Sequence, residues 1–185
     1  MAKKSMTKFY YLINSIAYYV AWIIGIKLAA NNYPWLSTCI VIIIAMLQIY
    51  WRYNANLTTN GLWHLLGSLL LISTLTDTAL VYCGFIVYAA NPFSPYFTAP
   101  WMVSIWINFV IILYIALYRL FNHLIILSIL SFLGFFITYN VGKTMGAVFF
   151  PYGYTTCFLV SAIWMILLPC TIYYYNIYHK IIGVK

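Results

Sequence analysis

The feature that most constrains this chain is the near absence of charge from long apolar stretches. Charged residues make up 5% of the 185 positions, whereas soluble domains carry about 25% because water must wet their surfaces. Hydrophobic residues make up 66%. A surface of this composition suits hydrocarbon, so the sequence predicts an integral membrane protein.

Six apolar stretches have the length of a membrane-spanning helix, which needs roughly 20 residues. Polar or proline-containing turns separate them, and they cover about residues 9–30, 35–51, 63–90, 100–118, 122–146 and 155–178. The fourth begins at Pro100, because proline is tolerated in the first turn of a helix. The predicted fold is therefore all-α: one polytopic membrane helix bundle with six transmembrane helices, forming a single domain over residues 1–185.

The basic residues predict the orientation of this bundle. Of the nine Lys and Arg residues, only Lys27 and Lys143 lie at the predicted outer ends of helices. The others lie at the opposite ends, and they are Lys3, Lys4, Lys8, Arg52, Arg119, Lys180 and Lys185. Because cytoplasmic loops carry an excess of Lys and Arg, we expect both termini to be cytoplasmic.

The scarcity of acidic residues excludes several kinds of chemistry. Asp77 is the single acidic residue, so paired-carboxylate catalysis within one chain and Asp-rich Mg²⁺ or Ca²⁺ sites are excluded. The cysteines stand alone and the histidines lack the spacing of metal ligands. We therefore expect no metal and no cofactor. Membrane topology explains the net charge of +8, and no nucleic-acid partner is expected.

Asp77 is the strongest candidate for a functional residue. About 21 Å of helix separates it from the predicted inner surface, which places it near mid-membrane or slightly beyond. A charged Asp there costs roughly 2.5–3.5 kcal/mol, so its side chain must face the bundle interior. Ser73, Thr74 and Gly84 share its helix face, with Tyr88 one turn further. We predict a catalytic role for Asp77 and a ligand-binding role for Ser73 and Thr74. The alternative is an acid that only ties helices together.

Three glycines are predicted to serve helix packing. Gly142 and Gly146 are four residues apart in the fifth stretch, so they present one bare face to which another backbone can approach closely. Gly84, on the predicted face of Asp77, is the third. Packing at Gly142 and Gly146 would hold Lys143 near the bundle axis on the outer side.

Lys143 is the second candidate for a site residue. It lies between the two glycines of the fifth stretch, so a protonated Lys143 would pair with Asp77 or bind an anionic group such as a lipid phosphate. Snorkelling of the side chain to the membrane surface is the alternative. Tyr139, at the start of the same run, and Trp101, at the start of the fourth stretch, complete the predicted ligand-binding set.

Motifs along nearly the whole chain resemble one family in order and spacing. They are Pro34-Trp35; Asp77-Thr78-Ala79-Leu80-Val81 with Gly84; Pro100-Trp101 with Trp106 and Phe109; Gly134, Tyr139, Gly142-Lys143 and Met145-Gly146-Ala147; and Trp164 with Pro169. The pattern is similar to a bacterial inner-membrane family catalogued as domain of unknown function 2878. The chain departs from it at Thr76, where the family often has tryptophan, and at Phe135, where it often has proline. The resemblance implies a bacterial inner-membrane location. Because the family's genes often neighbour enzymes that modify membrane fatty acids, it also hints at lipid metabolism.

Three functions remain open on this evidence. The first is a lipid-associated protein, either an enzyme or an accessory subunit, that acts on an acyl or isoprenoid chain. In it Asp77 donates or accepts a proton and Lys143 anchors an anionic head group. The second is a small proton-coupled transporter in which Asp77 titrates. The third is a structural partner in a membrane complex. The expected partners are accordingly a membrane lipid and a membrane protein, and the residues do not decide whether the chain is an enzyme.

Overall fold

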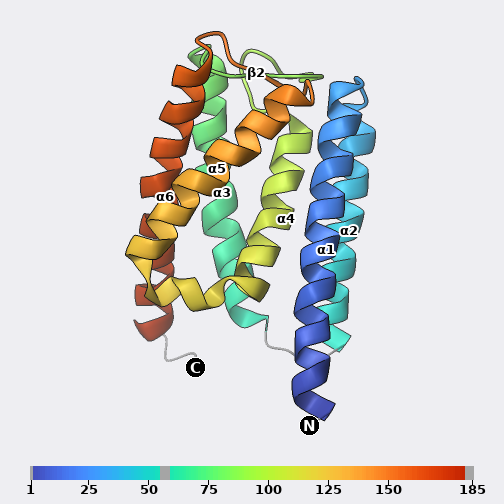
Figure 1. Cartoon of the computed structure of the whole chain (residues 1–185), viewed down its shortest axis with the longest axis vertical. Coiled ribbons are helices and arrows are strands. Elements are labelled where there is room, and N and C mark those ends of the chain that lie inside the picture. Colours follow the sequence, from blue (N-terminus) through green and yellow to red (C-terminus); the bar gives the residue numbers. More distant parts are fainter. Residues whose placement is uncertain (1, 55–58, 182–185) are drawn as a thin grey trace.

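The computed structural model describes residues 2–54 and 59–181, which form six α-helices in one bundle (Figure 1). The helices are α1 (Ala2–Ala30), α2 (Pro34–Asn54), α3 (Asn60–Tyr82), α4 (Pro100–Ala116), α5 (Leu124–Thr144) and α6 (Tyr154–Ile181). A 3₁₀ helix, η1 (Tyr118–Asn122), joins α4 to α5, and two short strands are β1 (Val87–Tyr88) and β2 (Val148–Phe149). The predicted all-α bundle is confirmed.

Five helices of the described residues are long and apolar enough to cross a membrane, namely α1, α2, α3, α5 and α6. The remaining helix, α4, has 17 residues, which at 1.5 Å per residue gives about 26 Å, close to the roughly 30 Å of hydrocarbon in a bilayer. Most of its side chains are buried, and it packs against α1, α2 and α3. The shortest α-helix, α4, is therefore the central one, since α1, α2 and α3 surround it.

The helices fall into two groups around α4. The hairpin of α1 and α2 packs against it, while α5 packs along α6, which in turn contacts α3. Helix α5 is inclined to the others, so it leans toward α1 at one end of the bundle and toward α6 at the other (Figure 1). This inclination leaves α1 and α5 facing each other across α4.

Basic residues gather at one end of the bundle, where α1 begins and α6 ends (Figure 1). We call this the inner end and the opposite one the outer end. The helices place Lys3, Lys4, Lys8, Arg52, Arg119 and Lys180 toward the inner end. Lys27 and Lys143 lie toward the outer end, and Lys185 lies outside the described residues. The distribution agrees with the predicted one, and the cytoplasmic assignment of the inner end remains a prediction.

Helix α3 ends well before the predicted residue 90. Gly84 adopts a φ of +73°, and its N–H donates to Val81 O at 3.0 Å while that of Phe85 donates to Leu80 O at 2.9 Å. This pair of bonds is a Schellman motif, which terminates helices at a left-handed glycine. The prediction failed because the residues that follow are apolar, and a short apolar run reads equally well as helix or strand.

Helix α5 ends in the same way, before the predicted residue 146. Gly146 has a φ of +78°, and its neighbour Ala147 donates to Gly142 O at 3.0 Å. The predicted helix-packing role of Gly84 and Gly146 is therefore wrong, because both lie beyond the ends of their helices. Gly142 is helical and buried, but a Cβ atom there would lie 3.3 Å from Val148 Cγ2. It packs against β2 and not against another helix.

Strands β1 and β2 join two connections between helices at the outer end. They pair antiparallel, with Val87 opposite Phe149 and Tyr88 opposite Val148. Each strand follows one of the Schellman glycines, so the α3–α4 and α5–α6 connections are joined in one ribbon (Figure 1). The ribbon places Tyr88, whose side chain is buried, over the outer end of the bundle.

Candidate functional site

Asp77 lies in the interior of the bundle, about 7 Å before the outer end of α3. Its side chain is 0% exposed. Its Oδ2 atom accepts a hydrogen bond of 2.7 Å from Trp106 Nε1 on α4, and its Oδ1 atom accepts one of 3.3 Å from the Tyr139 hydroxyl on α5. The carboxyl group therefore joins three helices through aromatic donors.

Tyr88 extends this arrangement to the outer ribbon. Its hydroxyl lies 3.5 Å from that of Tyr139. Since the Tyr139 hydroxyl donates a hydrogen bond to Asp77, it is free to accept one from the Tyr88 hydroxyl. Burial of Tyr88, followed by the nearby Asp77 carboxyl, holds the pKa of its phenol well above the ordinary value, so Tyr88 stays protonated. The result is a chain of hydrogen bonds from Tyr88 through Tyr139 to Asp77.

A wall of aromatic rings in contact with one another lies beside the Asp77 carboxyl group. The Trp106 ring centroid is 4.4 Å from that of Trp164 and 5.5 Å from that of Phe135. Phe135 stacks in turn on Trp164 at 5.1 Å. These contacts fix the orientation of Trp106, and hence the direction of its bond to Asp77.

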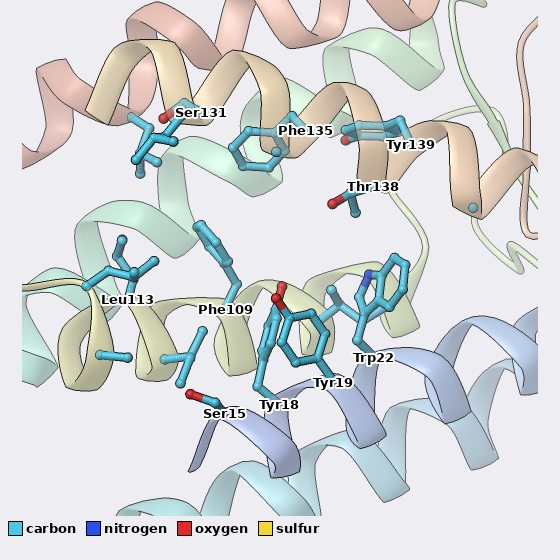
Figure 2. Close-up of a pocket in the computed structure, with 18 of the residues that line it drawn as sticks. Ser15, Tyr18, Tyr19, Trp22, Phe109, Leu113, Ser131, Phe135, Thr138 and Tyr139 are labelled. Carbon is cyan, nitrogen blue, oxygen red and sulfur yellow. The ribbon is translucent and has the colours of Figure 1, made fainter. Parts of the chain in front are cut away.

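A cleft of about 350 Å³ lies on the other side of this wall, between α1, α4 and α5 (Figure 2). Most of its lining is aromatic or aliphatic. The aromatic members are Tyr18, Tyr19, Trp22, Trp101, Phe109, Phe135 and Tyr139, and the hydroxyl-bearing aliphatic members are Ser15, Ser131 and Thr138. Helix α5 forms one wall of the cleft and α1 the opposite wall (Figure 2).

The cleft opens to the surface of the bundle. Among its lining residues, Tyr19 is 60% exposed, Leu130 47% and Leu117 38%. All three lie within or beside helices that are long or apolar enough for a membrane interior. The opening therefore lies between α1 and α5, alongside helices with the length and composition of membrane spans.

Tyr139 connects the buried acid to the cleft. It lines the cleft and donates to Asp77, whereas Asp77 is not among the described residues that line the cleft. Phe135 lies on the same wall and contacts Tyr139 with ring centroids 6.5 Å apart. A molecule in the cleft would therefore meet the Tyr139 phenol and not the carboxyl group itself.

The predicted ligand-binding residues divide into two groups. Tyr139 and Trp101 line the cleft, and Trp101 Nε1 donates to Ala89 O at 2.9 Å, which fixes its ring. Ser73 is buried and donates to Leu70 O within its own helix at 3.1 Å. Thr74 is half-buried on α3. Ser73 and Thr74 therefore share a helix with Asp77 but belong to the helix interior and not to the cleft.

Lys143 lies apart from both Asp77 and the cleft. Its Nζ atom sits 4.3 Å from the centroid of the Tyr154 ring on α6, a cation–π contact. No ion pair between Lys143 and Asp77 is present in the described part of the chain, so the structure does not bring the two predicted site residues together. An anionic ligand for Lys143 remains a prediction, at a position separate from the cleft.

Two histidines meet at the inner end. His64 of α3 stacks on Tyr178 of α6 with centroids 3.9 Å apart, and its ring centroid is 5.7 Å from that of His179. Among residues 2–54 and 59–181 no group of three or more His, Cys, Asp or Glu side chains that could hold a metal ion is found. We therefore interpret His64 and His179 as aromatic packing residues between α3 and α6.

Sequence reasoning missed most of the cleft. Tyr18, Trp22 and Thr138 were not singled out, because aromatic residues make up 21% of the chain and so mark no particular helix face. A weaker signal was present: Ser15, Tyr18, Trp22 and Ile26 recur at helical spacing and share one face of α1. Trp106, the strongest partner of Asp77, appeared only within a family motif.

Comparison with known proteins identifies a family and nothing more specific. The family model described as "Protein of unknown function (DUF2878)" matches residues 11–170. No curated protein and no solved structure matches the chain.

Proposed function

The chain belongs to the DUF2878 family, whose description names no activity, and we propose that it binds the hydrocarbon chain of a membrane lipid in the cleft between α1, α4 and α5. The observation that supports this proposal is the lateral opening of an apolar, aromatic-lined cleft on a membrane-spanning surface. Soluble ligands reach such a position poorly, whereas lipid chains surround it.

The dimensions of the cleft suit an extended chain. Its volume of about 350 Å³ lies within the roughly 300–1,000 Å³ of small-molecule pockets. Its lining on α5 runs from Leu127 to Gly142, a length of about 22 Å at helical rise. That is longer than one leaflet of a bilayer whose hydrocarbon core is about 30 Å thick. An acyl or isoprenoid chain lying along the helices fits this shape.

In this proposal Asp77 is a positioning residue that acts through Tyr139 and Trp106. Its two hydrogen bonds hold one cleft-lining residue and one residue of the wall behind it. Without the Asp77 carboxyl group, the Trp106 indole N–H and the Tyr139 hydroxyl would each lose an acceptor that water could not replace in a membrane interior. The carboxyl group thus keeps the aromatic wall in one arrangement.

The first prediction tests whether a lipid chain occupies the cleft, by substituting one glycine that lines the cleft and one control glycine that does not. Gly134 lines the cleft, and Gly67 on α3 does not; a Cβ atom at either position meets no heavy atom within 4 Å. Gly134→Leu adds a side chain to the lining of the cleft, at a position where the added Cβ atom meets no neighbour, and Gly67→Leu adds the same side chain away from the cleft. We expect Gly134→Leu to reduce crosslinking of a diazirine-bearing fatty acid in nanodiscs by at least about tenfold, because overpacking a filled site costs about 1–3 kcal/mol.

Gly67→Leu is expected to crosslink as the wild type does, and both variants must elute as folded protein of wild-type size. Equal crosslinking of Gly134→Leu and wild type would remove the proposed function. Peptide mapping of the crosslink gives a second readout: adducts are expected on α1 and α5 lining residues, and adducts confined to the outer surface of α2 or α6 would contradict the proposal.

A further inference from the structure

We propose that the lipid in the cleft carries an uncharged oxygen, a hydroxyl or a carbonyl, that hydrogen-bonds to Tyr18 and Thr138 in the membrane interior. This inference rests on the proposed function and adds the chemical class of the ligand. It assigns the site to lipid alcohols or ketones and excludes a phosphate-bearing head group from the cleft.

The charge of the cleft supports an uncharged ligand. None of the described residues that line it is Asp, Glu, Lys, Arg or His. The two outer basic residues lie elsewhere: Lys27 is exposed on α1, and Lys143 sits on the Tyr154 ring. A charge near the middle of a span is costly unless it is paired. A phosphate inside this cleft would have no cation to pair with.

The hydroxyl groups of the cleft supply the polar contacts. Among the side chains that the structure describes, in residues 10–54, 59 and 61–181, no hydrogen-bond partner is found for the side-chain oxygens of Ser15, Tyr18 and Thr138. Ser131, another lining residue, behaves differently, because its hydroxyl donates to Leu127 O of its own helix at 2.6 Å. A polar group left unpaired in an apolar medium costs free energy. Tyr18 and Thr138 therefore have bonding capacity available for a ligand.

Tyr18 and Thr138 face each other from opposite walls. The Tyr18 side chain rises from α1 toward α5, where Thr138 lies across the cleft (Figure 2). Tyr18 is about 12 Å from Tyr10, where the α1 span begins, and Thr138 is about 9 Å from the end of α5. Both positions lie inside the hydrocarbon zone. A ligand oxygen between them is thus remote from the head groups at either surface.

A hydroxyl or carbonyl oxygen meets the requirements of this pair. A carbonyl oxygen accepts from both the phenol and the threonine hydroxyl, while a ligand hydroxyl accepts from Tyr18 and donates to Thr138. A plain hydrocarbon fills the cleft but leaves both groups unpaired. The cleft therefore discriminates between lipids of equal length by one oxygen atom.

The test compares three probes with one carbon skeleton by native mass spectrometry of detergent-purified full-length protein: geranylgeraniol, the corresponding hydrocarbon, and geranylgeranyl diphosphate. The variants are Thr138→Val and Tyr18→Phe, with Thr144→Val as the matched control. Thr144 lies on the same helix, outside the cleft, and donates to Val141 O. Each hydroxyl-deleting variant is expected to weaken binding of the alcohol about fivefold, the equivalent of one hydrogen bond, and to leave hydrocarbon binding unchanged.

Wild type is expected to bind the alcohol more tightly than the hydrocarbon and the diphosphate. Tighter binding of the diphosphate would overturn the inference, as would an equal loss of alcohol and hydrocarbon binding in Thr138→Val and Tyr18→Phe. In either case the proposed function stands, because a chain still occupies the cleft. Failure of the wild type to bind any of the three probes removes the proposed function itself, and this inference with it.

Discussion

The hydrogen-bond partners of the Asp77 carboxyl group are aromatic side chains and not basic residues. Asp77 accepts from an indole at 2.7 Å and from a phenol at 3.3 Å, and the described basic side chains take no part. Its carboxyl group is fully buried, so the geometry of each donor matters. Replacing a buried acceptor leaves its donors unsatisfied, which costs more than the bond itself contributes.

The second prediction follows from this geometry. Asp77→Leu is expected to lower the free energy of unfolding by about 1–3 kcal/mol, because Trp106 and Tyr139 lose their acceptor in a site without water. Asp77→Asn is expected to stay near wild type, since its amide accepts from Trp106 and donates to Tyr139. Thermal unfolding in detergent measures both, with Thr76→Val on the same helix as the control. Equal stability of the Leu and Asn variants would show that the hydrogen bonds from Trp106 and Tyr139 do not contribute to the free energy of unfolding.

Helix endings give this fold its outer end. The three helices that run outward stop at residues with positive φ: Asn32 at 67°, Gly84 at 73° and Gly146 at 78°. A left-handed residue lets the last carbonyls of a helix be satisfied while the chain reverses direction. Close helix–helix approach occurs elsewhere, at Gly25, where a Cβ atom would lie 2.9 Å from Val41 Cγ2 of α2. Gly84 and Gly146 thus serve as helix caps, whereas Gly25 allows close helix packing.

The third prediction compares a capping glycine with a glycine in a helix interior that has no close neighbour. Gly84→Ala is expected to destabilise the protein by about 1–2 kcal/mol, the cost of the left-handed conformation for an L-residue, since no neighbouring atom opposes the added methyl group. Gly67→Ala, in the interior of α3 with equal space, is expected to stabilise by up to about 1 kcal/mol through helix propensity. Unfolding in detergent measures both. The same sign of change in the two variants would contradict the assignment of Gly84 as a cap.

The whole molecule is a bundle with connections across each end and a cleft along one side. The β1–β2 ribbon joins two connections at the outer end, and η1 turns the chain between α4 and α5 at the inner end. Between these connections lies the cleft, with α1 and the inclined α5 as its opposite walls (Figure 2). This lateral opening is the feature on which the proposed binding of a lipid chain rests.

The fourth prediction concerns the orientation of the bundle in the membrane. Cys83 is exposed at the outer end of α3, and Asn122 is exposed at the inner end, in η1. Because basic residues mark the cytoplasmic side, a membrane-impermeant maleimide is expected to label Cys83 in intact cells that express the protein, when the other cysteines are replaced by serine. Asn122→Cys in a cysteine-free chain is expected to be labelled only after lysis. The opposite pattern would invert the assignment of the two ends.

The sequence by itself determined the class of the protein, its apolar stretches and the burial of Asp77. These follow from composition and length, because a bilayer requires about 20 apolar residues per helix and a buried position for a charge. It also placed Tyr139 and Trp101 among the site residues, and both line the cleft.

Only the tertiary structure decided which donors meet Asp77, where α3 stops and where the cleft lies. In a chain that is apolar on every face, periodicity does not reveal which side of a helix faces a neighbour and which faces lipid. The distance between α1 and α5 depends on the inclination of α5 (Figure 1), which arises from packing along α6 and from the ribbon at the outer end. These are contacts between segments far apart in the chain, so no local pattern of residues encodes them.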